Sequence, residues 1–125
     1  NYGKQEVDVF APGVAIYSTI PGGNTYGNAN GTSMACPVVA GIAALLLEYY
    51  PTLSASQVKN IIEKSAVVIN TTVKKPGTSD QVMLSDISKT GGVVNAYEAV
   101  KLADTMLASL KPVIPAKPVK KSGKN

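Results

Sequence analysis

Apolar and polar residues alternate along two short stretches near the start of the chain. Residues 6–11 run Glu-Val-Asp-Val-Phe-Ala before a Pro-Gly pair, and the apolar-rich residues 14–20 end at a second Pro-Gly pair. Alternation with a period of two is typical of β-strands, and Pro-Gly pairs end them. We therefore expect two strands, followed over residues 24–31 by a loop or hairpin rich in Asn and Gly.

A long apolar helix is expected from about Thr32 to about Tyr50, where Pro51 would stop it. Thr32 or Ser33 is expected to cap its first turn. Its apolar residues are not confined to one stripe, because residues 38–47 cover nearly every face of a helix. A helix that is apolar all round must be surrounded by other elements.

Two more helices have recognisable starts. Ser54 and Gln57 fit a capping box that opens a helix to about Ser65, and residues 95–98 form a similar start for a helix to about Leu110. The region between them is mixed. We expect short strands at residues 67–69 and 82–84, a turn at residues 74–80 and a tight backbone site at Gly91 and Gly92.

Composition indicates one modest globular domain. The chain has 125 residues, of which 45% are hydrophobic and 16% charged. The net charge of +4 is concentrated at the end, because five of the twelve lysines lie in residues 111–125 and no acid accompanies them. We divide the chain into a globular part, residues 1–110, and a basic tail, residues 111–125, expected to be disordered or extended. The tail contains no arginine and no aromatic residue, which argues against a nucleic-acid partner.

Two absences limit the chemistry. The chain has no histidine, so the usual general base for a serine or cysteine nucleophile is missing from it. Its single cysteine, Cys36, lies in an apolar run and no Cys/His cluster accompanies it, so neither a metal site nor a cofactor is expected. The longest apolar stretch, residues 34–47, is shorter than a membrane span requires, and no span is expected.

The string Asn-Gly-Thr-Ser-Met-Ala at residues 30–35 is the main candidate for chemistry. A helix N-terminus presents free N–H groups and a partial positive charge. Ser33 in that position can attack a carbonyl group while its own N–H stabilises the oxyanion that forms. Gly31 lets a substrate or a neighbouring backbone approach closely. The alternative is structural, since Gly-Thr-Ser before a helix is also an ordinary capping sequence.

The surrounding sequence resembles the serine region of subtilases. Residues 7–13 read Val-Asp-Val-Phe-Ala-Pro-Gly, similar to that family's DVxAPG segment. Residues 31–41 match its GTSMAxPxVAG motif, and residues 92–96, Gly-Val-Val-Asn-Ala, are similar to a segment near the end of those domains. The resemblance implies the C-terminal portion of a three-layer αβα fold with a mostly parallel sheet, an α/β architecture that this chain would leave incomplete.

The same resemblance implies that Ser33 is the nucleophile of an endopeptidase that cleaves peptide or protein substrates. The Asp and His of the triad, and a side-chain oxyanion donor, would lie upstream, so the upstream part of the domain is the expected partner. Asn30, Gly31 and Thr32 would border the substrate cleft. Family resemblance also implies a secreted or cell-envelope protein, although no signal peptide is visible in the chain.

Several other residues have both a structural and a functional interpretation. Val38 stands where subtilases often have His, and both Val38 and Cys36 are interpreted as core packing. Asp8 matches a non-catalytic family position. Tyr26 is a candidate for substrate contact. The helical tyrosines are expected in the core or at its boundary; these are Tyr49, Tyr50 and Tyr97.

Two other functions remain possible from the sequence. One is a non-catalytic subtilase-like binding or structural module, and the other is an esterase of the α/β-hydrolase class. The second requires a strand directly before the serine, where this chain has an Asn/Gly loop. Under the leading interpretation the chain alone is inactive, because it lacks a base. Alone it is also poorly stable, because its apolar helix is uncovered.

Overall fold

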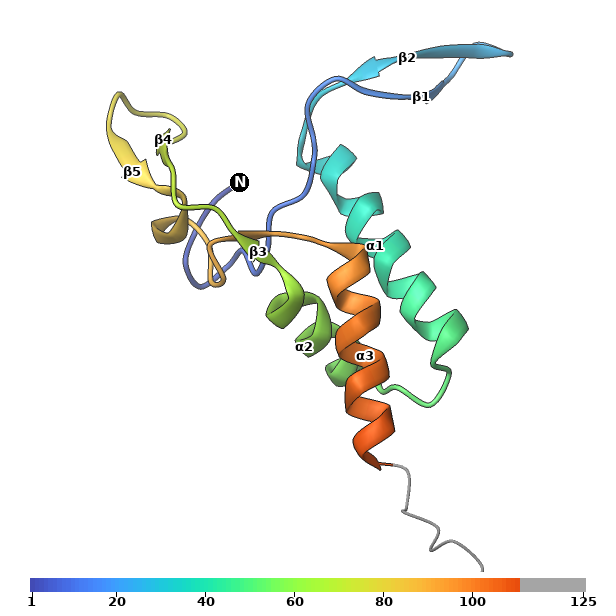
Figure 1. Cartoon of the computed structure of the whole chain (residues 1–125). Helices are drawn as coiled ribbons and strands as arrows, with labels where there is room; N and C mark the ends of the chain where they lie inside the picture. The colour runs from blue at the N-terminus through green and yellow to red at the C-terminus, as the bar shows by residue number, and fades with distance from the viewer. Residues whose placement is uncertain (111–125) are drawn as a thin grey trace, which may run out of the picture.

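Three helices and three small sheets make up the described part of the chain (Figure 1). The computed structural model describes residues 1–110, so the basic tail expected at 111–125 lies outside the described residues. The helices are α1 (Thr32–Tyr49), α2 (Ala55–Ser65) and α3 (Ala96–Leu110). The strands are β1 (Ile16–Ile20), β2 (Thr25–Ala29), β3 (Val67–Val68), β4 (Thr72–Lys74), β5 (Gln81–Met83) and β6 (Gly92–Val93), with a 3₁₀ turn at Leu84–Asp86.

The core lies where the three helices meet. Leu46 of α1 and Ile61 of α2 are fully buried, as are the two alanines of α3 that let the helices approach closely, Ala99 and Ala103. The capping box predicted at the start of α2 is confirmed. The Ser54 hydroxyl accepts from the Gln57 N–H at 3.3 Å, and the Gln57 side chain accepts from the Ser54 N–H at 2.8 Å.

The predicted mostly parallel sheet is not formed within residues 1–110. The three sheets are two-stranded and antiparallel: β1 with β2, β3 with β6, and β4 with β5. One parallel bridge, between Phe10 and Val93, is what remains of the strand expected at residues 6–11. That segment has a hydrogen-bonded neighbour on one side only, so no continuous strand is assigned to it.

The short strands expected on either side of the turn at residues 74–80 do not pair with each other. The strand at 67–68 pairs with β6, and β5 closes a hairpin with β4 instead. The tight site at Gly91 is confirmed, because its φ is 65° and a Cβ there would lie 2.7 Å from the Ser85 Cα.

Helix α1 is much less enclosed than its apolar sequence predicts. Only Ile42 and Leu46 are buried along its 18 residues, while Leu45 and Leu47 are 37% and 43% exposed. Within residues 1–110, α2 and α3 cover only one side of α1, which agrees with the expectation that this apolar helix is uncovered in the chain alone. By length and composition alone, α1 is also able to cross a membrane, a property that core helices share.

The expected core placements of several α1 and α3 residues need correction for the same reason. Cys36 is exposed, and so are Tyr49 and Tyr97, at 70% and 69%. Tyr50 is partly buried, as expected of a boundary residue, and its hydroxyl reaches the Val100 carbonyl at 3.5 Å.

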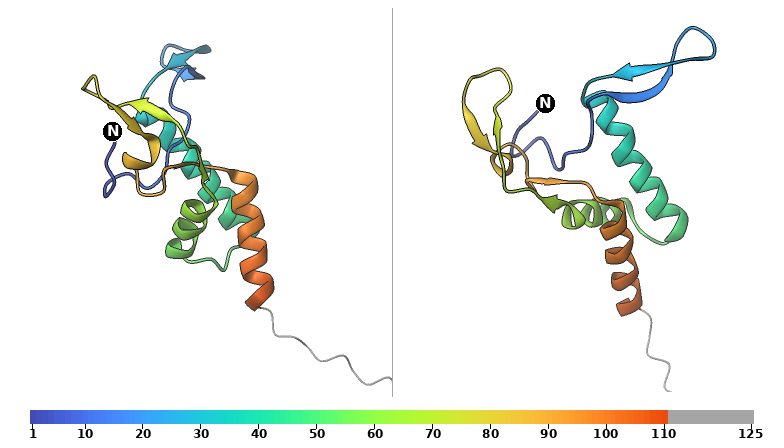
Figure 2. Two further views of the ribbon diagram at one scale, coloured as in Figure 1. Left: turned by 60° about the vertical axis from the view of Figure 1, so that its left-hand side comes forward. Right: turned by 45° about the horizontal axis from the view of Figure 1, so that its top comes forward.

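The β1–β2 hairpin stands away from the helices, and both views of Figure 2 show it clear of the rest of the chain. It begins at Ile16 instead of the expected residue 14, because Ala15 has a positive φ of 53° and interrupts the extended backbone. Tyr17 and Tyr26 stack across it with ring centroids 5.8 Å apart, and both are exposed. The hairpin returns the chain directly to the start of α1.

Candidate active site

Ser33 is the second residue of α1 and is exposed to solvent. The expected capping by Thr32 or Ser33 is wrong: the N-cap is Gly31, and the helix start has no side-chain capping hydrogen bond. Among residues 1–110, neither the Ser33 hydroxyl nor its N–H has a hydrogen-bond partner. A hydroxyl, a free N–H and the positive end of a long helix therefore face solvent together.

Gly31 places the Ser33 side chain through its backbone shape. Its φ of 147° lies in the region that favours glycine, and a Cβ there would lie 3.4 Å from the Ser33 Oγ. Its carbonyl accepts from the Met34 N–H at 2.9 Å, which starts the helix. Thr32 is held from another direction, because its hydroxyl accepts from the Asn1 side chain at 3.1 Å.

Two hydrogen bonds join the loop before Ser33 to the base of the hairpin. The Gly31 N–H donates to the Gly13 carbonyl at 2.7 Å, and the Ala15 N–H donates to the Asn30 Oδ1 at 2.6 Å. The approach is so close that a Cβ at Gly13 would lie 2.7 Å from the Gly31 oxygen. We call these two hydrogen bonds the clasp.

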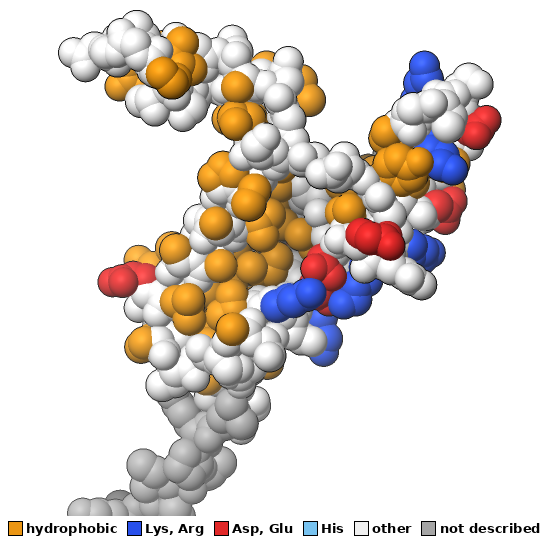
Figure 3. All heavy atoms as spheres, turned by 180° about the vertical axis from the view of Figure 1, so that it is seen from behind, with side chains coloured by type: hydrophobic (Ala, Val, Ile, Leu, Met, Phe, Trp, Pro, Cys, Tyr) orange, Lys and Arg blue, Asp and Glu red, His pale blue; other side chains and the backbone are white. Residues whose placement is uncertain are grey.

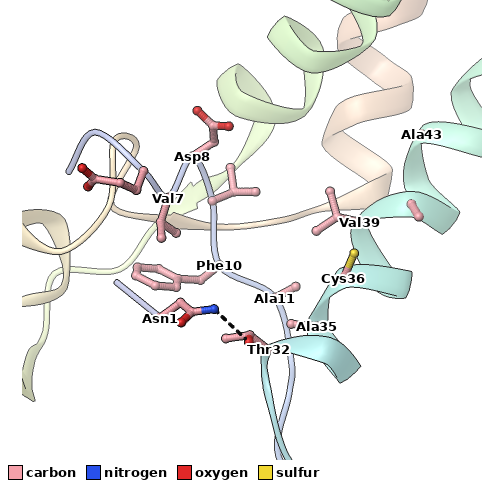
Figure 4. A pocket seen from close by; sticks show the side chains of 13 residues that line it. Asn1, Val7, Asp8, Phe10, Ala11, Thr32, Ala35, Cys36, Val39 and Ala43 are labelled. Carbon is pink, nitrogen blue, oxygen red and sulfur yellow. Dashed lines mark hydrogen bonds between the residues drawn. The ribbon is translucent and has the colours of Figure 1, made fainter. Parts of the chain in front are cut away.

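A cavity of about 540 Å³ lies between the N-terminal segment and α1 (Figure 4). Thr32 and Ala35 line it on the helix side, with Cys36 one turn after the helix start, and Ala11 faces them from the N-terminal segment; Phe10 also lines the cavity, but its ring points away from α1. Ser33 itself is not among the lining residues. The cavity therefore lies next to the nucleophile candidate without containing it.

A second cavity of about 400 Å³ continues along the same side of α1 and shares four lining residues with the first, Asp8, Val9, Val39 and Ala43. We call the two together the apolar trough. Figure 3 shows its hydrophobic side chains gathered on one face of the molecule, beside a cluster of charged groups. This trough is where α1 lacks the neighbours that its sequence predicts.

The charged cluster anchors the N-terminal segment. Lys59 lies 2.9 Å from Asp8 and 3.7 Å from Glu63, while Lys89 lies 2.8 Å from Glu63 and 3.7 Å from Asp8. The hydrogen bond from Lys59 is the main reason that the pKa of Asp8 is lowered, and the same contact raises the pKa of Lys59. The hydrogen bond to Glu63 raises the pKa of Lys89. Asp8 is thus held in ion pairs on a surface cluster.

No three His, Cys, Asp or Glu side chains within residues 1–110 are close enough together to hold an ion. The motif at residues 30–33 predicts neither Gly13 nor Ala15, the two residues that hold Gly31 and Asn30 in the structure. A glycine after proline gives some signal of a close backbone approach, whereas an alanine at positive φ gives none.

Comparisons with known proteins agree on one family. The family model described as "Subtilase family" matches residues 1–101. Subtilisin DY of Bacillus licheniformis is 62% identical over 61 residues, covering 49% of this chain and 22% of that protein. The subtilisin of Bacillus pumilus is 56% identical over 64 residues, covering 51% and 23%.

A solved structure extends the similarity to most of the chain. A chain from "Structural basis of subtilase cytotoxin SubAB assembly" matches with a TM-score of 0.65 and 28% identity, over 84% of this chain and 29% of that one. The present chain therefore spans less than a third of the length of each of these relatives.

Proposed function

Because the chain belongs to the subtilase family, which is a family of serine proteases, we propose that it supplies the nucleophile Ser33 of an endopeptidase. The observation that carries the proposal is the exposed Ser33 hydroxyl, free of hydrogen-bond partners within residues 1–110, at the positive end of α1. A nucleophile needs that freedom, whereas a capping serine uses its hydroxyl within its own helix.

The proposed reaction proceeds through an acyl-enzyme. The Ser33 oxygen attacks the peptide carbonyl carbon, and its proton passes to a histidine base and then to the leaving amine. The Ser33 N–H donates to the oxyanion, assisted by the α1 dipole. Water then attacks the ester, the base takes a proton from that water, and Ser33 recovers its proton as the acid product leaves. Asn30, Gly31 and Thr32 border the cleft in this arrangement.

The histidine must come from outside this chain, since the chain contains none. We propose that the upstream part of the catalytic domain supplies it, together with the aspartate and the oxyanion asparagine. The apolar trough supports this proposal, because its partly exposed residues would be covered by a larger fold. The chain's small share of its relatives' length agrees with the same view.

The backbone of the N-terminal segment supports it as well. Phe10 uses its N–H and carbonyl to pair with Gly92 and Val94. The backbone groups of Val9 and Ala11, which alternate to the opposite edge, have no hydrogen-bond partner among residues 1–110. An edge of this kind, beside an apolar trough, suits the addition of a further strand.

Two other features of the proposal rest on the family. The substrate is a peptide or protein, and the complete protein is secreted or held at the cell envelope, as implied by its subtilisin relatives. The alternative, a non-catalytic subtilase-like module, predicts the same exposed Ser33 but no turnover under any condition.

Reconstitution tests the proposal. The 125-residue chain would be assayed for peptide hydrolysis alone and after joining to the segment of subtilisin DY that precedes the matched region; we call this joined protein the completed protein. We expect hydrolysis by the completed protein only, and its loss in Ser33→Ala. Serine-dependent hydrolysis by the chain alone would contradict the assignment of the base to the upstream part. A folded but inactive completed protein would favour the non-catalytic module.

A further inference from the structure

We propose that Asn30 is a positioning residue, which sets the place of Ser33 by holding Ala15, and that substrate contact is not its main role. Its Oδ1 accepts from the Ala15 N–H at 2.6 Å, the shorter of the two hydrogen bonds in the clasp. Asn30 directly follows β2 and Ala15 directly precedes β1, so this side chain joins the two ends of the hairpin at its base. This role rests on the proposed function of Ser33.

Ala15 makes the hydrogen bond necessary. Its φ of 53° is the only positive value at a non-glycine residue within the described chain. Alanine avoids this conformation because its Cβ approaches the carbonyl oxygen, so neighbouring contacts must hold it there. Ala15 is exposed, and its side chain has no burial that would do so. The Asn30 oxygen is the contact that fixes its N–H.

The clasp reaches Ser33 through Gly31. Asn30 accepts a hydrogen bond from Ala15, and Gly31 donates one to Gly13. Both residues that precede α1 are therefore fixed to the segment that leads into β1. The Gly31 carbonyl then fixes the first turn through the Met34 N–H. If the Asn30 contact is lost, Ala15 can relax to negative φ, and the hairpin base and helix start lose their common register.

The competing interpretation is direct substrate contact through the Asn30 amide nitrogen. The two interpretations predict different couplings. A positioning role depends on the strain at Ala15, which Ala15→Gly removes because glycine adopts positive φ freely. A substrate contact is indifferent to the residue at 15. The double variant Asn30→Ala/Ala15→Gly therefore separates them.

Kinetics of the completed protein give the first test. We expect Asn30→Ala to lower kcat by about tenfold with KM changed less than about twofold, because a misplaced nucleophile slows chemistry more than binding. Ala15→Gly in the Asn30→Ala background should recover most of that kcat. Asn28→Ala is the matched control, since Asn28 is an exposed asparagine on the same hairpin with no side-chain hydrogen bond in the described chain, and should keep wild-type kinetics. A rise in KM with kcat unchanged, or no recovery in the double variant, would overturn the inference.

Amide NMR of the 125-residue chain gives a test that does not depend on activity. Asn30→Ala should shift the Ser33 amide resonance and accelerate exchange of the Ala15 amide, and the double variant should return the Ser33 resonance toward its wild-type position. An unmoved Ser33 amide in Asn30→Ala would refute the positioning role. An inactive completed protein with these NMR shifts intact would instead count against the proposed function and leave the clasp standing.

Discussion

The two serines at the starts of α1 and α2 are used in opposite ways. Ser54 is part of a closed capping box, and the helix that it starts packs Val58, Ile61 and Ile62 into the core. Ser33 makes no capping hydrogen bond, and its helix buries only Ile42 and Leu46. The α2 start satisfies its own backbone groups, whereas the α1 start leaves them available to another molecule.

The same contrast extends to the regions around them. Around α2, side chains of the chain itself supply the core and the caps. Around α1, the trough, the unpaired edge at Val9 and Ala11 and the exposed leucines have no covering neighbour within residues 1–110. The difference separates the part of the described chain that supplies its own core and caps from the part that our proposal completes with an upstream segment.

The largest effects are expected from neighbouring leucines on α1. Leu46→Ala should destabilise the chain by about 3 kcal/mol, because Leu46 is fully buried and its loss leaves a cavity. Leu47→Ala should cost less than about 1 kcal/mol in the chain alone, since Leu47 is 43% exposed. In the completed protein, Leu47→Ala should cost distinctly more. Denaturant unfolding of both forms measures this, and equal costs for Leu47→Ala in the two would break the comparison.

Capping gives the next effect. Ser54→Ala should destabilise the chain by about 1 kcal/mol, because it removes one half of the capping box. Ser33→Ala is the matched control and should change stability by less than about 0.5 kcal/mol, since no cap is lost. Thermal unfolding of the two variants compares them directly. A cost at Ser33 equal to that at Ser54 would mean that Ser33 serves the helix after all.

Gly41 offers a smaller effect whose sign is informative. A Cβ at Gly41 meets nothing within 4 Å, so Gly41→Ala should stabilise the chain alone by about 0.5–1 kcal/mol through a better helix propensity. In the completed protein we expect a loss of stability if, as we propose, the upstream part packs against this face of α1, because the added Cβ would then meet it. The same gain in both forms would show that nothing packs there.

The charged cluster gives the smallest effect. The lowered pKa of Asp8 means that its contribution to stability is present above its ordinary value of 3.8 and is lost as pH falls through the folded value. The contribution should be below about 1 kcal/mol, because the Asp8 side chain is 37% exposed and solvent screens the pair. Urea midpoints at pH 7 and pH 3 should differ less in Asp8→Asn than in the wild type. An unchanged difference would assign the acid sensitivity to other groups.

The elements with local signals were predicted best from the sequence. The α2 start was read from Ser54 and Gln57, and the hairpin and α1 from proline, glycine and apolar runs. The sheet was predicted poorly, because its pairing depends on segments distant in sequence, as in the single bridge between Phe10 and Val93. Exposed positions such as Cys36 were assigned to a core that this chain only partly builds.

In the candidate site, too, local features could be predicted from the sequence and contacts between distant residues could not. The motif predicts residues 30–33 as the candidate site, and the structure places the Ser33 hydroxyl in the open at the start of α1. The clasp could not be predicted, because the positive φ at Ala15 is held by a hydrogen bond to Asn30, which is distant in sequence, and leaves no mark in the residue type.

Active-site labelling most directly tests the central claim, that Ser33 is a nucleophile awaiting its base. A fluorophosphonate would be incubated with the 125-residue chain and with the completed protein, and the modified residue identified by mass spectrometry. We predict a single adduct on Ser33 in the completed protein and none on the chain alone. An adduct on another serine, or none on Ser33 in a completed protein that is folded, would contradict the account.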